Sequence, residues 1–435
     1  MNTIASRPQR RIRSTGGAAA VFVIGMLALQ GGCTEGASTP PALSMRDSAG
    51  VRIVESRAPV WRTGEEWTIA PEPEVVIGVV EGEVPYLLSS VRDAARLSDG
   101  RIVVANGGSS ELRIFDATGR YLRALGGEGR SPGEFENLNS LHLLPGDSLA
   151  AWDGILHRLT IFTEDGRVGR EWTVDALAVL MPPILGIFND GTLLSVTSGG
   201  RARTDAAQEE YRDSLLWVRV RPGTTRMDVI GDGLGTENLI IAEANSAQNY
   251  QILFGRTSLV TGTGDRWFSA DNGRYEIRVA SPTGELAALL RRIVEPRPAT
   301  PEILASAREE VTRQQLRSEA AIRSFTEQQG GTYTGQRMAA DEIPHRTTLP
   351  FFEKLLVDEV GNLWVRDYRP TGEFRQLWSV FDRTGRWLGE VETPEAIDVF
   401  RVGDDYLLGR AKDAMEVESV HLYRLSKPPV ETISP

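Results

Sequence analysis

Short stretches in which apolar and polar residues alternate follow one another along this chain, separated by turns rich in Gly, Asp and Pro. The clearest example spans Glu111 to Phe135. Leu112 and Ile114 alternate with polar neighbours before the Asp-Ala-Thr-Gly break at 116–119, after which the alternation resumes. Because Asp and Gly suit tight turns, this pattern predicts a two-stranded hairpin. The Gly- and Pro-rich run ending at Phe135 predicts a loop that leads to the next element.

Weaker copies of this unit recur, and each begins with a Gly/Asp turn followed by a short apolar strand. The six apolar strand positions are Ile102, Leu149, Leu193, Trp267, Leu363 and Tyr406. Their spacings are 47, 44, 74, 96 and 43 residues. Three spacings match the ~40–50-residue period of a four-stranded propeller blade, and the two long ones correspond to one period plus an insertion. A second apolar strand follows each copy in register.

These repeats predict an all-β fold, a six-bladed β-propeller over residues 50–428. A single blade cannot bury both faces, so the blades must stack on one another and close into a circle. The sixth copy ends after its third strand, near Leu425. Glu74–Gly78 resembles the fourth strand of the first copy, so this N-terminal strand is predicted to complete the last blade. Val51–Val54 is expected to extend the same edge.

Two insertions interrupt the repeat. The first, at Ser198–Arg212 and Gly231–Asn249, is polar and Gly-rich, and we expect long loops there. The second spans about residues 300–350. It opens with Thr300, Pro and Glu, which are the capping hydroxyl, first-position proline and first-turn acid typical of a helix start. An apolar stripe then predicts a helix to about Gln328, packed on a blade edge or over one face.

The N-terminus has the features of an export signal. Four arginines precede the apolar run Ala18–Leu29, which has the length of a signal-peptide core and is short for a membrane span. The run ends in Leu-Gln-Gly-Gly-Cys33, which resembles a bacterial lipoprotein signal, although Gln30 departs from the usual pattern. Arg10 and Arg11 also allow twin-arginine export, but their flanking residues fit it poorly.

Cys33 is the only cysteine, which excludes intramolecular disulfides and suits lipidation. The domain prediction is therefore a signal peptide at residues 1–33 and a flexible tether at 34–49. After the propeller, a tail occupies residues 429–435. We expect an exported protein anchored by its lipid in the bacterial cell envelope, with an ordinary signal and a free Cys33 as the alternative.

The repeated Asp-Gly-x-aliphatic-x-Val unit, the hairpins at Arg113–Arg120 and Leu377–Arg386, and the Gly-rich loop at Gly127–Phe135 resemble NHL-repeat and other bacterial six-bladed propeller proteins. The resemblance covers about residues 66–425 and weakens in the third and fourth copies. It implies an exported or lipid-anchored propeller. It implies no single function, because propellers include both binding proteins and enzymes.

The net charge of the chain restricts the classes of partner that it is expected to bind. The chain has a formal net charge of −11, and its four N-terminal arginines would leave with the signal peptide. Such an acidic surface argues against non-specific nucleic-acid binding, which depends on Lys and Arg. The expected partners are the membrane, through the lipid, and a protein, peptide or glycan ligand, with the chain itself a monomer.

Polar residues at the ends of several second strands, together with one blade-to-blade loop, are the candidate binding groups. Loops on one face of a propeller surround the central channel, so we expect these side chains to gather there: Asn106, Arg130, Glu134, Asp153, Asp271 and Asp367. A ring of carboxylates could hold Ca²⁺. The competing interpretation, which turn statistics favour, is that each Asp binds backbone N–H groups of its own turn.

Other chemistries are poorly supported, so no cofactor is expected apart from that Ca²⁺ possibility. The chain has only four histidines, on elements that are not expected to converge on a zinc ion: His142, His157, His345 and His421. The Gly-rich runs lack the Lys-Ser/Thr of a phosphate loop, and no serine lies in an elbow motif. The sequence thus favours a binding or scaffolding module without catalytic residues. The alternative is a Ca²⁺-dependent propeller hydrolase or lactonase.

Overall fold

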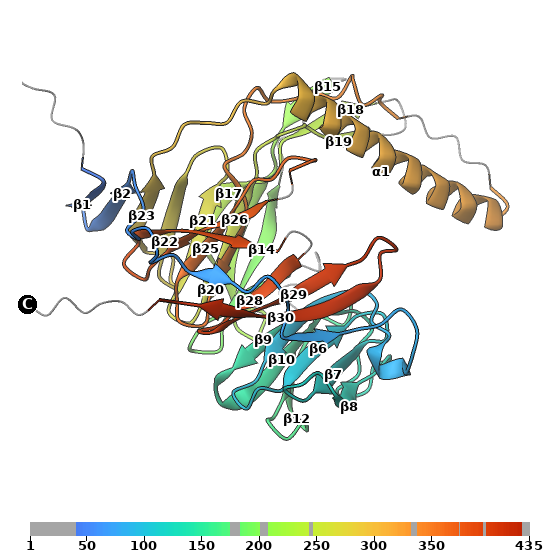
Figure 1. Ribbon diagram of the computed structural model, residues 1–435. Helices are drawn as coiled ribbons and strands as arrows, with labels where there is room; N and C mark the ends of the chain where they lie inside the picture. Colours follow the sequence, from blue (N-terminus) through green and yellow to red (C-terminus); the bar gives the residue numbers. More distant parts are fainter. Residues whose placement is uncertain are drawn as a thin grey trace, which may run out of the picture. The chain divides into compact units, whose positions relative to one another are not determined.

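Antiparallel sheets repeat the predicted order of inner strand, turn, second strand and hairpin in the computed structural model (Figure 1). The structure describes residues 41–174, 183–200, 208–242, 247–331, 337–373, 375–394 and 397–428. The predicted signal peptide, Cys33, the first part of the tether and the tail at 429–435 lie outside these residues. Pro41 to Pro435 form one of the two units of the chain, and all the described sheets belong to it.

The first three sheets have four strands each, in chain order from the inner to the outer strand. Sheet one holds β5 (Val91–Arg96), β6 (Ile102–Asn106), β7 (Glu111–Phe115) and β8 (Tyr121–Gly126). Sheet two holds β9 (Leu138–Leu144), β10 (Ser148–Asp153), β11 (Arg158–Phe162) and β12 (Val168–Thr173). Sheet three holds β13 (Ile184–Ile187), β14 (Leu193–Gly200), β16 (Ser214–Val220) and β17 (Met227–Leu234). The opening hairpin is therefore β7–β8, as predicted.

The next three sheets keep this order, and two of them recruit N-terminal strands. Sheet four holds β20 (Ser258–Thr263), β21 (Arg266–Asp271), β22 (Glu276–Ala280) and β23 (Leu286–Arg292), then β2 (Val51–Ser56) and β1 (Leu43–Ser48). Sheet five holds β24 (Phe352–Val357), β25 (Leu363–Asp367), β26 (Gln376–Phe381) and β27 (Trp387–Thr393). Sheet six holds β28 (Ile397–Val402), β29 (Tyr406–Lys412) and β30 (Glu418–Ser426), with β3 (Thr68–Ile69) and β4 (Val75–Ile77) both paired to β30.

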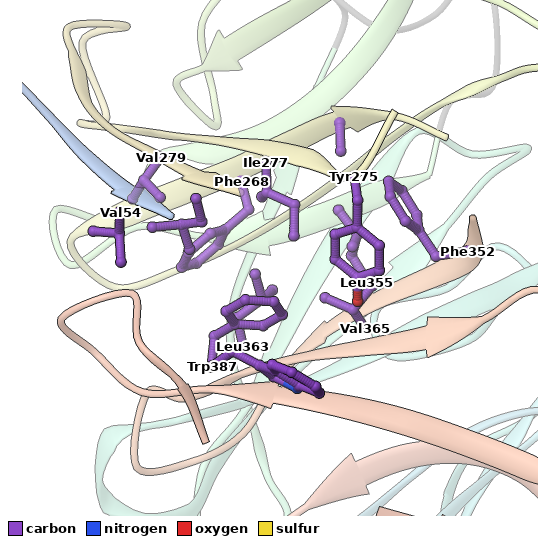
Figure 2. Close-up of a cluster of buried hydrophobic side chains, with 13 residues drawn as sticks. Val54, Phe268, Tyr275, Ile277, Val279, Phe352, Leu355, Leu363, Val365 and Trp387 are labelled. Carbon is purple, nitrogen blue, oxygen red and sulfur yellow. The ribbon is translucent and has the colours of Figure 1, made fainter. Parts of the chain in front are cut away.

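Apolar clusters join each of these sheets to the next. Figure 2 shows one of them, in which Phe268 and Ile277 of sheet four lie close to Leu363 and Trp387 of sheet five. Another cluster joins sheet six to sheet one. Propeller blades are stabilised in this way, because each sheet buries both of its faces against its neighbours. A lone sheet would leave its apolar surface exposed to solvent. The all-β propeller prediction is confirmed.

The predicted closing strand is correct, and its neighbour is not. In β4, Ile77 pairs with Val420 of β30, so the N-terminal strand completes the last sheet. Val51–Val54, however, lies in β2 and runs parallel to β23, where Val54 pairs with Leu290. In addition, β1 occupies residues that the sequence assigned to the tether.

The structure differs from the prediction in the first insertion and agrees with it in the second. The expected long loops instead include a seventh, three-stranded sheet of β15 (Gln208–Tyr211), β18 (Asn238–Ala242) and β19 (Ala247–Gln251). The polar strands β15 and β19 lack the alternation that marks a strand, and the apolar run of β18 is short and lies within a polar, Gly-rich insertion. The helix is confirmed as α1 (Pro301–Gln328), capped by the Thr300 side chain. Two short 3₁₀ turns are η1 (Val84–Tyr86) and η2 (Pro145–Asp147).

Among the described residues, the apolar contacts of helix α1 lie along its first half. Leu304, Ala307 and Val311 contact a cluster that includes buried Leu253 and Phe254. Ile322 and Phe325 continue the same apolar stripe but are exposed. Figure 1 shows the far end of the helix (orange) extending away from the labelled strands. Within the described part of the chain, no helix combines the length and the apolar character needed to span a bilayer.

Candidate functional site

A cavity of about 990 Å³ lies where the innermost strands of all six sheets meet. Each of these strands contributes side chains to the lining, for example Asp93 (β5), His142 (β9), Ile187 (β13), Thr261 (β20), Lys354 (β24) and Arg401 (β28). The lining continues into the turns that follow these strands, at Pro145, Gly191 and Gly264. Its size is that of a pocket for a small organic ligand.

Arg401 ties three sheets together at the wall of this cavity. Its Nη2 lies 3.2 Å from the Asp93 carboxylate and its Nε donates to the carbonyl of Ala94, both in sheet one. The same guanidinium donates to the carbonyl of Leu141 in sheet two. Burial raises the pKa of Asp93, while Arg401 acts in the opposite direction. The Nε and Nη2 atoms of this arginine therefore connect sheet six to sheets one and two.

A second ionic group surrounds Asp398 of β28. Lys354 Nζ donates to Asp398 Oδ1 at 2.9 Å and to the carbonyl of Val399 at 2.7 Å, and Arg410 Nη2 approaches Oδ2 at 3.3 Å. Burial opposes ionisation of Asp398, but Lys354, Arg410 and Arg366 together hold its pKa below the usual value. The ion pairs link sheets five and six and neutralise Lys354.

His142 adds a neutral polar group to the lining. Burial lowers its pKa to about 3, with a further contribution from Arg401. Its Nε2 lies 3.3 Å from Ser140 Oγ. A Ser-His contact suggests a nucleophile and base, but an imidazole with so low a pKa is a weak base at neutral pH. The pair is better suited to hydrogen bonding than to catalysis.

The cavity also reaches outward between sheets two and three. Leu159 and Ile161 of β11 and Arg170 and Trp172 of β12 line this part. The Arg170 guanidinium lies 5.2 Å from the centroid of the Trp172 ring, as in a cation–π contact. This side arm is thus mostly apolar, with one cation at its wall.

The sequence-predicted site residues lie elsewhere. Asn106, Asp153, Asp271 and Asp367 end their second strands as expected. In sheet two, Ser148 beside the cavity pairs with the last residue of β9, whereas Asp153 pairs with the first. The predicted groups therefore lie at the end of the sheets opposite to the cavity.

Asn106 and Asp153 are buried, and their side chains bond nearby turns and loops. Asn106 Oδ1 accepts from the backbone N–H of Ser89 at 2.8 Å, and its Nδ2 donates to Ser109. Asp153 accepts four backbone N–H bonds, those of Glu136, Asn137, Ile155 and Leu156, at 2.6 to 3.1 Å. This arrangement matches the interpretation that turn statistics favour, in which such a side chain binds backbone N–H groups.

Asp271 and Asp367 instead pair with arginines. Asp271 lies 2.7 Å from Arg212 and accepts from the N–H of Gly273. Asp367 lies 3.7 Å from Arg292, yet burial raises its pKa to about 7. Arg292 is shared, because it also contacts Glu390 and stacks on Trp387.

Arg130 and Glu134 form local contacts in the loop between β8 and β9. Arg130 is exposed and donates to Glu136 at 2.5 Å. Glu134 accepts from the N–H of Ser131 at 2.8 Å. None of these contacts tests whether the six residues bind a ligand, which remains a prediction.

Among the described residues, no three His, Cys, Asp or Glu side chains lie together as a metal site would require. The four histidines occupy separate elements. His142 is on β9 and His421 on β30, while His157 lies in the β10–β11 turn and His345 bridges to Leu253.

Sequence reasoning missed the cavity residues. Asp93, Lys354 and Arg401 are charged positions on inner strands, but each of these strands carries another charged residue, such as Arg92, Glu353 or Asp398. The sequence pattern therefore does not distinguish the charged residues that face the cavity from those that do not. The pattern does not reveal which strand supplies each partner.

No family model matches this chain, and no curated protein matches it. Solved structures of similar fold do exist. A putative exported protein from Bacteroides fragilis is 12% identical, with a TM-score of 0.44, over 87% of this chain and 100% of that one. A DUF4221 family member from Bacteroides vulgatus is 10% identical, with a TM-score of 0.39, over 83% and 99%.

A virginiamycin B lyase from Staphylococcus aureus is also similar, at 11% identity and a TM-score of 0.33, over 83% of this chain and 99% of that one. At such identities the likeness concerns the fold alone. Ligand and activity have to be argued from the residues of this chain.

Proposed function

We propose that this chain is a cell-envelope binding module, a six-bladed propeller of the NHL-repeat type, anchored by a lipid on Cys33. Its ligand is a protein, peptide or glycan, part of which enters the central cavity. The observation that carries the proposal is the 990 Å³ cavity lined by the innermost strands of sheets one to six. A cavity with mixed apolar and polar walls suits recognition of an amphipathic group.

Binding is favoured over hydrolysis by the state of the polar groups. Arg401 and Lys354 are held by Asp93 and Asp398, and the weakly basic His142 cannot strongly activate Ser140. These groups offer hydrogen bonds and shape without a strong nucleophile.

The proposal is tested by filling part of the cavity with a larger side chain. Thr263 is exposed at the cavity wall, so Thr263→Trp would fill space there without burying a polar group. The matched control is Thr224→Trp, an exposed turn residue outside the cavity lining. The mature lipoprotein in nanodiscs would be applied to peptide and glycan arrays.

We expect some array members to bind and Thr263→Trp to weaken their binding at least about tenfold, with Thr224→Trp unchanged. Binding that survives the plug, or no binding at all, would count against the cavity as the ligand site.

The anchor is tested separately by metabolic labelling with palmitate. The wild-type chain should incorporate label and Cys33→Ala should not, since only a thiol can receive the lipid. Equal labelling of both chains would refute lipidation at Cys33.

A further inference from the structure

The cavity wall carries one cation that is paired with no carboxylate among the residues that the structure describes. Its charged lining residues are the acids Asp93 and Glu359 and the cations Arg170, Lys354 and Arg401. Four of these five groups are already paired with other side chains. The remaining one is Arg170.

Asp93 pairs with Arg401 at 3.2 Å, and Lys354 pairs with Asp398 at 2.9 Å. Glu359 accepts a hydrogen bond of 2.5 Å from the Tyr406 hydroxyl. The Arg170 guanidinium has no hydrogen bond or ion pair with any residue that the structure describes.

Arg170 is exposed and lies over the face of Trp172. The indole is half-buried, and Leu159, Ile161 and Ile187 of the neighbouring strands line the same space. A planar apolar surface beside a free guanidinium suits a ring that carries an acidic group, since the ring stacks while the acid forms charge-assisted hydrogen bonds. The local positive charge stands out in a chain whose net charge is −11.

We infer that the side arm of the cavity, formed by Arg170 and Trp172, binds small organic acids in which an apolar or aromatic ring carries a carboxylate or sulfonate. This inference rests on the proposed function, because it specifies the ligand class of the same cavity. In a larger ligand, such a group would be the part that enters the cavity.

Two probes of nearly equal shape separate charge from shape: naphthalene-2-sulfonate, an anion, and naphthalene-2-sulfonamide, which is neutral. Each would be titrated calorimetrically into the mature lipoprotein in nanodiscs, with empty nanodiscs as the blank. The variants are Arg170→Gln and, as a matched control, Arg167→Gln. Arg167 is exposed in the preceding turn, pairs with Asp165 and does not line the cavity.

The sulfonate is expected to bind at least about tenfold more tightly than the sulfonamide, because only the sulfonate adds a negative charge that attracts the Arg170 guanidinium and strengthens its hydrogen bonds. Arg170→Gln should remove this preference while leaving sulfonamide binding unchanged, and Arg167→Gln should keep it. Raising the salt concentration should weaken only the sulfonate.

Equal binding of both probes, or a preference that persists in Arg170→Gln, overturns the inference. If that equal binding is abolished by Thr263→Trp, the cavity still stands as a binding site and only the acid preference fails. If neither probe binds, the inference fails, and the array experiment decides the proposed function independently.

Discussion

Glu418 of β30 accepts a hydrogen bond from the backbone N–H of Val91 in β5, with 2.6 Å between Oε2 and N. The two residues are 327 positions apart, and both are buried. Arg410 reinforces the junction, because its Nη1 donates to the Val91 carbonyl at 2.9 Å and lies 3.3 Å from Glu418. The last and first sheets are thus joined by a polar clamp as well as by apolar packing.

Removing the clamp should destabilise the whole propeller. Glu418→Ala leaves a buried N–H without a partner and removes one of two acids that face Arg410, which together should cost about 2–4 kcal/mol of unfolding free energy. The midpoint of urea unfolding, followed by tryptophan fluorescence, would report the loss. Glu416→Ala is the control, since that side chain is 70% exposed and its pair with Lys412 should contribute under about 1 kcal/mol. Equal effects of the two variants would contradict a clamp.

Asp367 makes stability depend on pH in an unusual direction. Burial, opposed by Arg292, raises the pKa of its carboxyl to about 7, whereas the unfolded value is about 4. Between these values the folded state holds the proton more tightly, so stability falls as pH rises from about 4 to about 7.

Asp367→Asn removes this titration. Compared with the wild type, the variant should gain relative stability across that window, by at most about 4 kcal/mol. Melting temperatures of both chains at pH 5 and pH 8 would measure the change. A constant difference between the chains at the two pH values would exclude the raised pKa.

His142 makes stability depend on pH in the direction opposite to that of Asp367. Burial, aided by Arg401, lowers its pKa to about 3, while an unfolded histidine titrates near about 6.5. Its contribution is complete above about pH 6.5 and is lost as pH falls toward 3. Replacing His142 by Gln should therefore reduce the loss of unfolding free energy that occurs as pH falls toward 3. The exposed His345→Gln is the control. If His142→Gln leaves that loss unchanged, the lowered pKa of His142 is refuted.

Gly284 illustrates why glycine follows the third strand of most copies. Its φ is +92°, and a Cβ there would lie 2.4 Å from the carbonyl oxygen of Ile230 in the preceding sheet. Gly284→Ala should cost about 2–4 kcal/mol, from the left-handed backbone and the clash together. Gly191 has φ of +76° with nothing near its Cβ position, so Gly191→Ala should cost only about 1 kcal/mol. Urea unfolding of the two variants would compare them, and equal losses would mean that the close approach contributes nothing.

The repeated alternation and the Gly/Asp turns predicted most strands, since a hairpin is formed by residues close in sequence. The Thr300 cap and the apolar stripe likewise predicted α1 to its last residue, Gln328. Strands whose pairing depends on residues far away in the sequence were harder to predict. The pattern at 51–54 identified a strand but not its place beside β23. The polar strands β15 and β19 gave no signal, and the short apolar run of β18 lay within the insertion that was expected to form loops.

For the candidate site, turn chemistry correctly indicated how Asp153 is used, because its four donors lie in its own turn or in the preceding loop. The cavity was beyond such reasoning. Its lining comes from the innermost strands of six sheets and from the other strands of sheet two, spread between Asp93 and Arg401, and no local pattern says which side chains face one another.

By itself, the sequence determined most strands of the repeat, the hairpin turns and the helix start, because backbone preferences and alternation act over a few residues. The tertiary structure alone decided which sheet each N-terminal strand joins, that Glu418 meets Val91, and that Arg170 is left without a carboxylate among the described residues. Those outcomes depend on contacts between sheets, whose energies involve residues hundreds of positions apart.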